Sequence, residues 1–353
     1  MESVKIRGYE WMSVTIKDVA RIAGVSPSTV SRVISGHTRI SPQTTKKVKL
    51  IMEELGYFPN IMAKSLVSKT TRTLGIILPR PAEELFLNLF FAEIIRGILA
   101  QSMRASYDIL LTSSFSDKDE IETITKLVKG RRVDGIILLS SRKNDPSIQF
   151  LRDQNFPFVL IGRSADYPDV TSVDNDNVQA AYDATNHLIA QGHTNIRFVT
   201  GPEEMVVSQD RLAGYKKAMS EANINIAQDW IIEGELLSQS GYRAMSFIMS
   251  QQNPPTALVV FDDVAAFGVL RGLTELGIKV PDQIKLVSFN NIAISELASP
   301  PISSIDIGTY QLGYSASQTL IRVVQNEPLN AKEMIIPHRL IIRESSMNKV
   351  SRV

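Results

Sequence analysis

Short apolar runs separated by mixed segments dominate the chain from Leu74 onward. The runs are LGIILP, YDILLTSS, VDGIILLSS, FPFVLIG, IRFVTG, TALVVFDD and IKLVSFNN, and a helical or turn segment follows each of them. Continuous apolar strands that alternate with helices predict a parallel sheet covered on both faces. About 270 residues of this pattern exceed one doubly wound sheet, so we expect two α/β lobes.

The first 60 residues have a different pattern, with apolar positions at helical spacing. Thr15 precedes a helix over residues 16–22 with Asp18 as its capping-box partner, and Gly24 ends that helix. Ser26 caps a second helix that starts at Pro27. The Ser-Pro pair at 41–42 repeats this start signal for a third helix that ends at Gly56. The segment NIMAKSLVSKTTRT then has the character of a linker.

Composition narrows the class of protein. The chain has no Cys and four His among its 353 residues, which argues against disulfides and a structural zinc site and fits a reducing compartment. No apolar run approaches the roughly 20 residues of a membrane helix, and the N-terminus lacks the apolar core of a signal peptide. We therefore expect a cytoplasmic protein that contacts no membrane and needs neither a metal nor a cofactor.

The charge is unevenly distributed along the chain. Residues 1–72 contain 12 Lys and Arg against 5 Asp and Glu, whereas the remainder has 26 against 32. A basic head on an acidic body favours an anionic polymer as the partner of the head. A solvated basic face without a partner is the alternative.

The stretch GVSPSTVSRV gives the basic head a specific chemistry. Two short helices joined at a glycine match a helix-turn-helix, whose second helix lies in the DNA major groove, although many such pairs only pack together. Small side chains at the start of the second helix allow close approach to the bases, hydroxyls can donate, and an arginine can bind guanine or phosphate. The residues predicted to contact DNA are Thr15, Ser26, Pro27, Ser28, Thr29, Ser31 and Arg32.

Longer motifs extend this interpretation. VTIKDVARIAGVSPSTVSRVISG resembles the N-terminal signature of the LacI/GalR family of bacterial transcription regulators, and ISPQTTKKVKLIMEELGYFPNIMAKSL resembles its third helix and hinge helix. The resemblance continues through HLIAQGHTNIRFVTGP, VVFDDVAAFGVLRGLTELGIKVPDQIKLVSFNN and LIIRES, and covers nearly everything after Met12. NLFFAEIIRGI and RLAGYKKAM are most similar to the maltose-operon (MalR-type) regulators of that family.

The resemblance implies a fold and its boundaries. An N-terminal all-α helix-turn-helix domain precedes an α/β two-lobed core of the periplasmic-binding-protein type (type I). The implied segments are a disordered extension (1–12), the helix-turn-helix domain (13–59), the hinge helix and linker (60–72) and the ligand-binding and dimerisation core (73–346). Within the core we expect lobe one over about 73–162 and 308–329, and lobe two over about 163–305 and 332–346.

The resemblance also implies functional residues. In this family the hinge helices of two chains meet on operator DNA, and each inserts a leucine into the minor groove. The matching positions are Asn60, Ala63, Lys64 and Leu66. A small sugar effector binds between the lobes, at the carboxyl ends of strands. The candidate effector contacts are Pro79, Arg80, Phe91, Arg211, Asp262 and Asn290.

Two departures limit how far the family's ligand can be carried over. Gly162 and Asn290 stand where sugar-responsive relatives often have Asp, although Asn290 offers both a donor and an acceptor. The expected function is a homodimeric, DNA-binding repressor that is not an enzyme and responds to maltose or a related α-glucoside.

Alternatives remain open at this stage. One is a family member with a different effector or a co-repressor mechanism, and a higher oligomer is another. A more distant one is a sugar-active enzyme on a doubly wound fold, which the absence of the GxxxxGK[ST] and GxGxxG phosphate loops disfavours.

Overall fold

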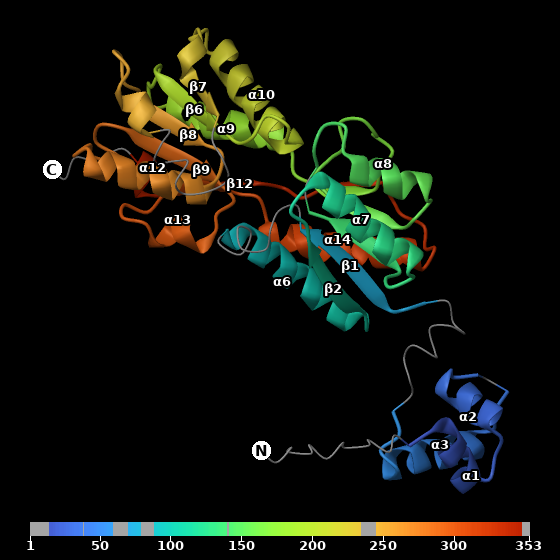
Figure 1. Cartoon of the computed structure of the whole chain (residues 1–353). Coiled ribbons are helices and arrows are strands. Elements are labelled where there is room, and N and C mark those ends of the chain that lie inside the picture. Colours follow the sequence, from blue (N-terminus) through green and yellow to red (C-terminus); the bar gives the residue numbers. More distant parts are fainter. Residues whose placement is uncertain are drawn as a thin grey trace, which may run out of the picture. The chain divides into compact units, whose positions relative to one another are not determined.

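The computed structural model describes residues 14–37, 39–58, 70–78, 88–139, 141–233 and 245–347. The chain forms two compact units, Met1–Thr71 and Arg72–Val353 (Figure 1). The predicted extension 1–12 and most of the predicted hinge, residues 60–69, lie outside the described residues.

The described part of the first unit contains three helices, α1 (Ile16–Ala23), α2 (Pro27–Ile34) and α3 (Pro42–Glu54). Their ends follow the predicted signals. The Ser26 hydroxyl accepts a hydrogen bond from the Thr29 backbone N–H at 3.2 Å, and Gly24 has a positive φ of 65° after α1. The predicted helix starts and turn are therefore present, and each is explained by local capping chemistry.

A small apolar core holds the three helices together. Its members come from one face of each helix at helical spacing, which leaves the opposite faces to solvent. The buried residues are Val19, Ala20, Ala23, Val30, Val33, Val48 and Ile51.

The first lobe of the second unit is built on a parallel sheet in the order β11-β5-β4-β3-β1-β2. Helices α6 and α14 cover one face of this sheet, and α7 and α8 cover the other (Figure 1). The elements are β1 (Thr73–Leu78), α6 (Leu89–Arg104), β2 (Asp108–Ser113), α7 (Asp117–Lys129), β3 (Gly135–Leu138), α8 (Pro146–Asp153), β4 (Phe158–Ile161), β5 (Ser172–Asp174), α14 (Thr309–Val324) and β11 (Glu333–Ile335).

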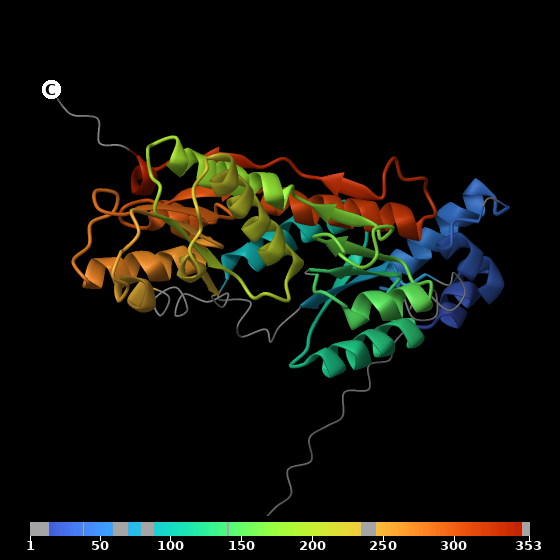
Figure 2. The same cartoon turned by 90° about the horizontal axis from the view of Figure 1, so that it is seen from above.

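The second lobe repeats this plan, with the sheet order β12-β10-β9-β8-β6-β7 and one antiparallel edge strand, β12. Helices α9 and α10 pack side by side on one face, and α12 lies on the other (Figures 1 and 2). The elements are α9 (Asn177–Ile189), β6 (Ile196–Thr200), α10 (Val206–Glu221), η1 (Gln228–Trp230), β7 (Ile231–Glu233), β8 (Ala257–Val260), α12 (Asp263–Glu275), β9 (Lys285–Phe289), α13 (Ala293–Leu297), β10 (Ser303–Asp306), β12 (Arg339–Ile341) and η2 (Glu344–Ser346).

The lobe boundaries differ from the predicted ones at two strands. The expectation that residues 163–305 and 332–346 belong to lobe two is wrong for β5 and β11, which pair with each other in the sheet of lobe one. The first crossover therefore lies between β5 and α9, and the third lies between β11 and β12. The apolar run FPFVLIG is followed by a second, three-residue strand that is too short to be recognised from its sequence pattern.

One side chain ties the three crossovers together. The Asn175 side-chain amide donates to the Ile307 carbonyl and to the Ile336 carbonyl, each at 2.8 Å. These three residues belong to the three different crossing segments, and all three are buried. The three segments that join the lobes are thus hydrogen-bonded to one another through the Asn175 side chain, and we call them the interlobe hinge.

Helices α6 and α14 approach each other very closely in lobe one. A Cβ built on Gly97 of α6 would lie 2.1 Å from the Tyr310 carbonyl, and one on Gly313 of α14 would lie 2.0 Å from the Ile94 carbonyl. Backbone-to-backbone packing at these two points requires glycine.

Among the helices of the described residues, none has the length and apolar character needed to span a membrane.

Candidate functional site

The exposed face of α2 presents hydroxyls and one guanidinium. Ser26, Pro27, Ser28, Ser31 and Arg32 are exposed. The Ser26 hydroxyl lies 2.8 Å from that of Ser28. The helix therefore begins with small polar groups that leave its first turn open to a close partner.

Two further candidate residues of this unit take part in capping. The Thr29 hydroxyl, which is half-buried, lies 2.9 Å from the Ser26 hydroxyl. The Thr15 hydroxyl donates to the Asp18 carboxylate at 2.7 Å, and this bond lowers the pKa of Asp18. Thr15 thus holds the start of α1, and its position at that helix terminus is fixed.

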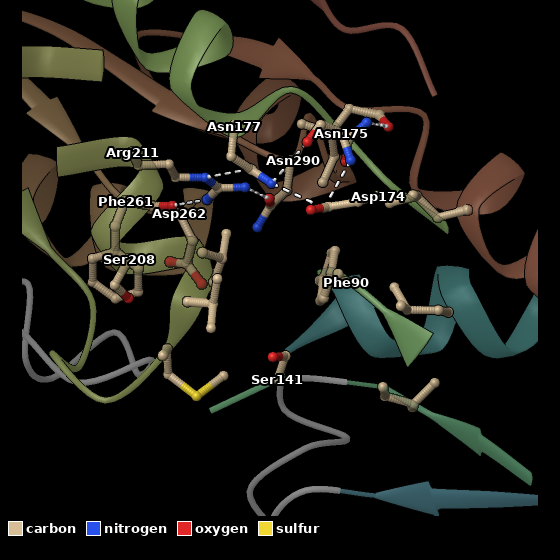
Figure 3. A pocket seen from close by; sticks show the side chains of 18 of the residues that line it. Phe90, Ser141, Asp174, Asn175, Asn177, Ser208, Arg211, Phe261, Asp262 and Asn290 are labelled. Carbon is tan, nitrogen blue, oxygen red and sulfur yellow. Dashed lines mark hydrogen bonds between the residues drawn. The ribbon is translucent and has the colours of Figure 1, made fainter. Parts of the chain in front are cut away.

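A cleft opens between the two lobes at the carboxyl ends of their strands (Figure 3). A small ligand binds at this place in open α/β sheets because the strand ends and helix starts converge there. The lining residues are Asn88, Phe90, Phe91, Leu139, Ser141, Ile161, Gly162, Arg163, Asp174, Asn175, Asn177, Met205, Val206, Val207, Ser208, Arg211, Phe261, Asp262, Asn290, Ile307 and Leu312.

Arg211 of α10 organises the lobe-two side of the cleft. Its guanidinium donates to the Asn177 side-chain oxygen at 3.2 Å, to the Phe261 carbonyl and to the Asn290 side-chain oxygen at 3.3 Å (Figure 3). It also lies 4.4 Å from the centroid of the Phe289 ring. Burial lowers the pKa of Arg211 to about 10, so the group stays charged at neutral pH.

Asp262 lies at the start of α12 and faces the cleft. One carboxylate oxygen accepts from the Ala265 backbone N–H at 2.7 Å and so caps the helix. The other accepts from the Asn88 side-chain amide of lobe one at 3.0 Å. Burial raises the pKa of Asp262 to about 6.

A second buried carboxylate, Asp174 at the end of β5, also lines the cleft. It accepts from the Asn175 backbone N–H at 2.7 Å and from the Asn177 side-chain amide at 3.0 Å. Burial raises its pKa to about 6. The neighbouring Asp176, by contrast, caps α9 by accepting from the Gln179 backbone N–H at 2.8 Å.

The lobe-one side of the cleft is more apolar and holds one unsatisfied hydroxyl. Phe90 and Phe91 form an edge-to-face pair with ring centroids 5.1 Å apart, and both line the cleft. The Ser141 side-chain oxygen is buried and has no hydrogen-bond partner within the part of the chain that the structure describes. Such a group is costly unless something supplies the missing partner.

Four of the six predicted effector residues meet in this cleft, namely Phe91, Arg211, Asp262 and Asn290. Pro79 and Arg80 lie outside the described residues, as do Asn60, Ala63, Lys64 and Leu66 of the predicted hinge. The sequence interpretation did not assign the other polar lining groups to the cleft: Asn88, Ser141, Arg163, Asp174, Asn175, Asn177 and Ser208. Recognising β5 as a strand would have placed Asp174 and its neighbours at a strand end.

Comparison with known proteins identifies the family to which this architecture belongs. Residues 15–60 match the model of the bacterial regulatory proteins of the LacI family, and residues 185–346 match the periplasmic binding protein-like domain. Catabolite control protein A of Priestia megaterium is 35% identical over 95% of this chain and 100% of its own length. The chain belongs to the LacI family.

Other members of the family extend the similarity. The transcriptional regulator MalR of Streptococcus pneumoniae is 34% identical, over 94% of this chain and 99% of its own. The structure of the lac repressor dimer bound to operator and the anti-inducer ONPF superimposes with a TM-score of 0.84 at 25% identity, and covers 95% of this chain and 100% of that one. The predicted family and fold class, a helix-turn-helix unit followed by a two-sheet α/β core of periplasmic-binding type, are thereby confirmed.

No group of three or more His, Cys, Asp or Glu among the described residues is arranged to hold a metal ion.

Proposed function

We propose that this protein is a sequence-specific DNA-binding repressor of transcription that is controlled by a small sugar bound in its cleft. The observation that carries the proposal is the exposed face of α2, where small hydroxyl residues and Arg32 follow a tight turn in a LacI-family unit. It is supported by the lac repressor structure, which contains operator DNA.

The chemistry of α2 suits the major groove. Pro27 and Ser28 occupy little space, so the helix start can approach base edges and phosphates closely. Hydroxyls at Ser26, Thr29 and Ser31 offer donors to phosphate oxygens, and Arg32 offers a bidentate fork to guanine or phosphate. Thr15 lies at the start of α1 and adds a further contact to the DNA backbone.

The linker completes the proposed DNA interface. Asn60, Ala63, Lys64 and Leu66 would form a hinge that pairs with its counterpart in a second chain on the operator. An apolar wedge such as Leu66 unstacks a base step at a cost of about a few kcal/mol, which contacts to the bent DNA offset. Two half-sites read by two heads require a homodimer.

The cleft suits a polyhydroxylated ligand. Carboxylates at Asp262 and Asp174 accept hydrogen bonds, the Asn290 amide donates while its oxygen is held by Arg211, and the Ser141 hydroxyl lacks a partner in the described structure. The rings of Phe90 and Phe91 provide an apolar surface for a sugar ring. Pro79 and Arg80, which follow β1 directly in the sequence, are proposed as further effector contacts.

We further infer that the sugar is maltose or a related α-glucoside. Support comes from the 34% identity to MalR over almost the full length of both chains. A different effector, or one that strengthens DNA binding, is the second candidate, because catabolite control protein A is as similar as MalR. With either effector, we expect the protein to act in the cytoplasm, where its operator DNA lies, and to do so without catalysis.

The decisive experiment is operator binding by the purified protein at fixed salt, with DNA from upstream of its own gene and its neighbours. Maltose that weakens binding supports an inducible repressor, and maltose that strengthens it makes the sugar a co-repressor. Tight binding that ignores maltose removes the proposed ligand and keeps the regulator. Absence of specific binding under every condition contradicts the regulator itself.

A further inference from the structure

An ion pair joins the two lobes beside the cleft. Arg163 follows β4 of lobe one, and Asp210 lies in α10 of lobe two. The Arg163 Nε donates to one oxygen of the Asp210 carboxylate at 2.7 Å, and a terminal guanidinium nitrogen donates to the other. This bidentate geometry is the strongest form of an arginine–carboxylate contact.

The pair lies at the rim of the cleft. Most lining residues are buried, whereas Arg163 belongs to the partly exposed ones, together with Phe90, Gly162, Met205 and Val207. The Arg163 side chain is 43% exposed and the Asp210 side chain only 9% exposed. A half-exposed guanidinium can leave the contact for water, but the carboxylate that it covers has little access to solvent.

Charge around the pair keeps it together. The hydrogen bonds from Arg163 to Asp210 raise the pKa of Arg163, and the nearby carboxylates Asp174 and Glu333 act in the same direction. The guanidinium is therefore held by acidic groups of both lobes, with Asp210 as its direct partner.

Three further contacts across the cleft use neutral donors. The Lys143 backbone N–H donates to the Glu204 carbonyl at 3.1 Å, and the Val206 backbone N–H donates to the Ser141 carbonyl at 3.2 Å. Asn88 reaches Asp262 through its amide at 3.0 Å. Arg163 and Asp210 add a full charge pair to this set, on the same side of the hinge as the cleft.

We propose that Arg163 and Asp210 form a latch that holds the two lobes closed in the ligand-free protein and controls how fast a ligand enters and leaves the cleft. The interlobe hinge consists of three single crossing segments that the Asn175 side chain hydrogen-bonds to one another. The lobes can therefore rotate about it. Opening has to separate the ion pair, because its two members are attached to different lobes. The latch concerns the cleft itself and does not depend on which sugar binds.

The absence of cysteine in the chain allows a direct test in the full-length protein. Lys129→Cys at the end of α7 and Arg271→Cys in α12 place one exposed spin label on each lobe. Electron double resonance then measures the distance between the labels without ligand. With the labelled chain diluted in an excess of unlabelled chain, so that a dimer carries one labelled pair, we expect one distance population for the parent protein and an added longer-distance population for Arg163→Ala and for Asp210→Ala.

A double-mutant cycle separates a latch from two unrelated effects. If the residues act as one contact, Arg163→Ala with Asp210→Ala opens the lobes no further than either single change. The matched control is Arg152→Ala, which removes an ion pair to Asp169 that lies within lobe one and should leave the distance unchanged. Asp210→Asn preserves the shape of the side chain and covers the case in which Asp210→Ala fails to fold.

Two results would overturn the latch. One is a distance distribution for Arg163→Ala and Asp210→Asn that matches the parent. The other is opening that adds up across the two sites. With maltose as the probe, Arg163→Ala should also speed ligand dissociation about tenfold; this last readout rests on the proposed function, so its failure alongside the expected label distances counts against maltose only.

Discussion

Most buried polar side chains in the cleft have a hydrogen-bond partner, whereas the buried Ser141 hydroxyl has none in the part of the chain that the structure describes. Arg211, Asn177, Asn290 and Asp174 form one continuous hydrogen-bonded set that fixes their positions before a ligand arrives. A preformed set loses little conformational entropy on binding. The cleft therefore combines a hydrogen-bonded polar wall with the Ser141 hydroxyl, which is available to a ligand.

Ser141→Ala should separate stability from ligand binding. Removing a buried hydroxyl that lacks a partner in the described structure should raise the free energy of unfolding of the ligand-free protein by about 1 kcal/mol. The same change should weaken maltose binding about tenfold, the equivalent of roughly 1.4 kcal/mol, because the ligand loses a hydrogen bond. Urea denaturation and calorimetric titration measure the two effects, and a loss of stability would contradict the assignment of the hydroxyl.

Asp174→Asn should stabilise the fold at neutral pH. The pKa of Asp174 is raised from 3.8 to about 6 by burial, so the folded protein binds this proton more tightly than the unfolded chain does. Stability consequently falls as pH rises from about 4 to about 6, and the penalty is fully present above that window. Asparagine removes the charge and keeps an oxygen for the Asn175 and Asn177 donors.

We expect a gain of about 1–3 kcal/mol at pH 7.5 that disappears below about pH 4. Urea titrations at several pH values measure it. Asp176→Asn, which changes the exposed cap of α9, is the control and should show no such pH-dependent gain. A gain that is equal at pH 4 and pH 7.5 would exclude the buried charge as its cause.

The close packing of α6 against α14 depends on glycine, because a side chain at Gly97 or Gly313 would meet the backbone of the other helix. Gly97→Ala introduces a Cβ 2.1 Å from the Tyr310 carbonyl, so the two helices must separate. Overpacking of this kind costs about 1–3 kcal/mol, and a clash with backbone lies at the upper end. Thermal or urea unfolding should show this loss of stability. Leu99→Ala is the control in the same helix, and it should change stability far less because Leu99 is 41% exposed.

Elements were predictable from the sequence where local chemistry determines them. Caps at Ser26 and Ser41 and the turn at Gly24 set the three N-terminal helices, and long apolar runs marked β1, β3, β8 and β9. Short strands were not predictable in this way. β5 and β11 have three residues each. β5 is a strand because it pairs with the nearby β4, and β11 is a strand because it pairs with β5 across more than 150 residues of chain.

Site residues follow the same division. Asp262 and Asn290 could be named because they follow the apolar strands β8 and β9, and Arg211 could be named because its sequence motif resembles that of the family. Asn88 and Arg163 could not, because their importance lies in contacts to Asp262 and Asp210 on the other lobe. Pairings between lobes depend on the tertiary arrangement and leave no periodic signal in the sequence.

At the scale of the whole molecule, DNA binding should depend on Arg32 more than on any charge of the ligand-binding unit. Arg32→Ala should weaken operator binding by about 1–3 kcal/mol, roughly 5- to 150-fold, if the guanidinium binds a base edge. A phosphate contact would instead reduce the slope of log affinity against log salt by about one and weaken all sequences alike. Fluorescence anisotropy at several salt concentrations measures both quantities.

The control for this experiment is Arg271→Ala, an exposed arginine of α12 in the second unit. It removes the same charge from the protein, so a general electrostatic effect would appear in both variants. Equal losses for Arg32→Ala and Arg271→Ala would argue against α2 as the recognition helix.

The three crossovers impose an order on folding while the protein is being synthesised. The sheet of lobe one needs β11 at Glu333–Ile335, and the sheet of lobe two needs β12 at Arg339–Ile341. A ribosome has therefore translated almost the entire core before either lobe can close its sheet, whereas the helical unit within residues 1–71 can fold as soon as it emerges. During translation the nascent chain would therefore carry a folded helix-turn-helix unit while its ligand-binding core is still unfolded.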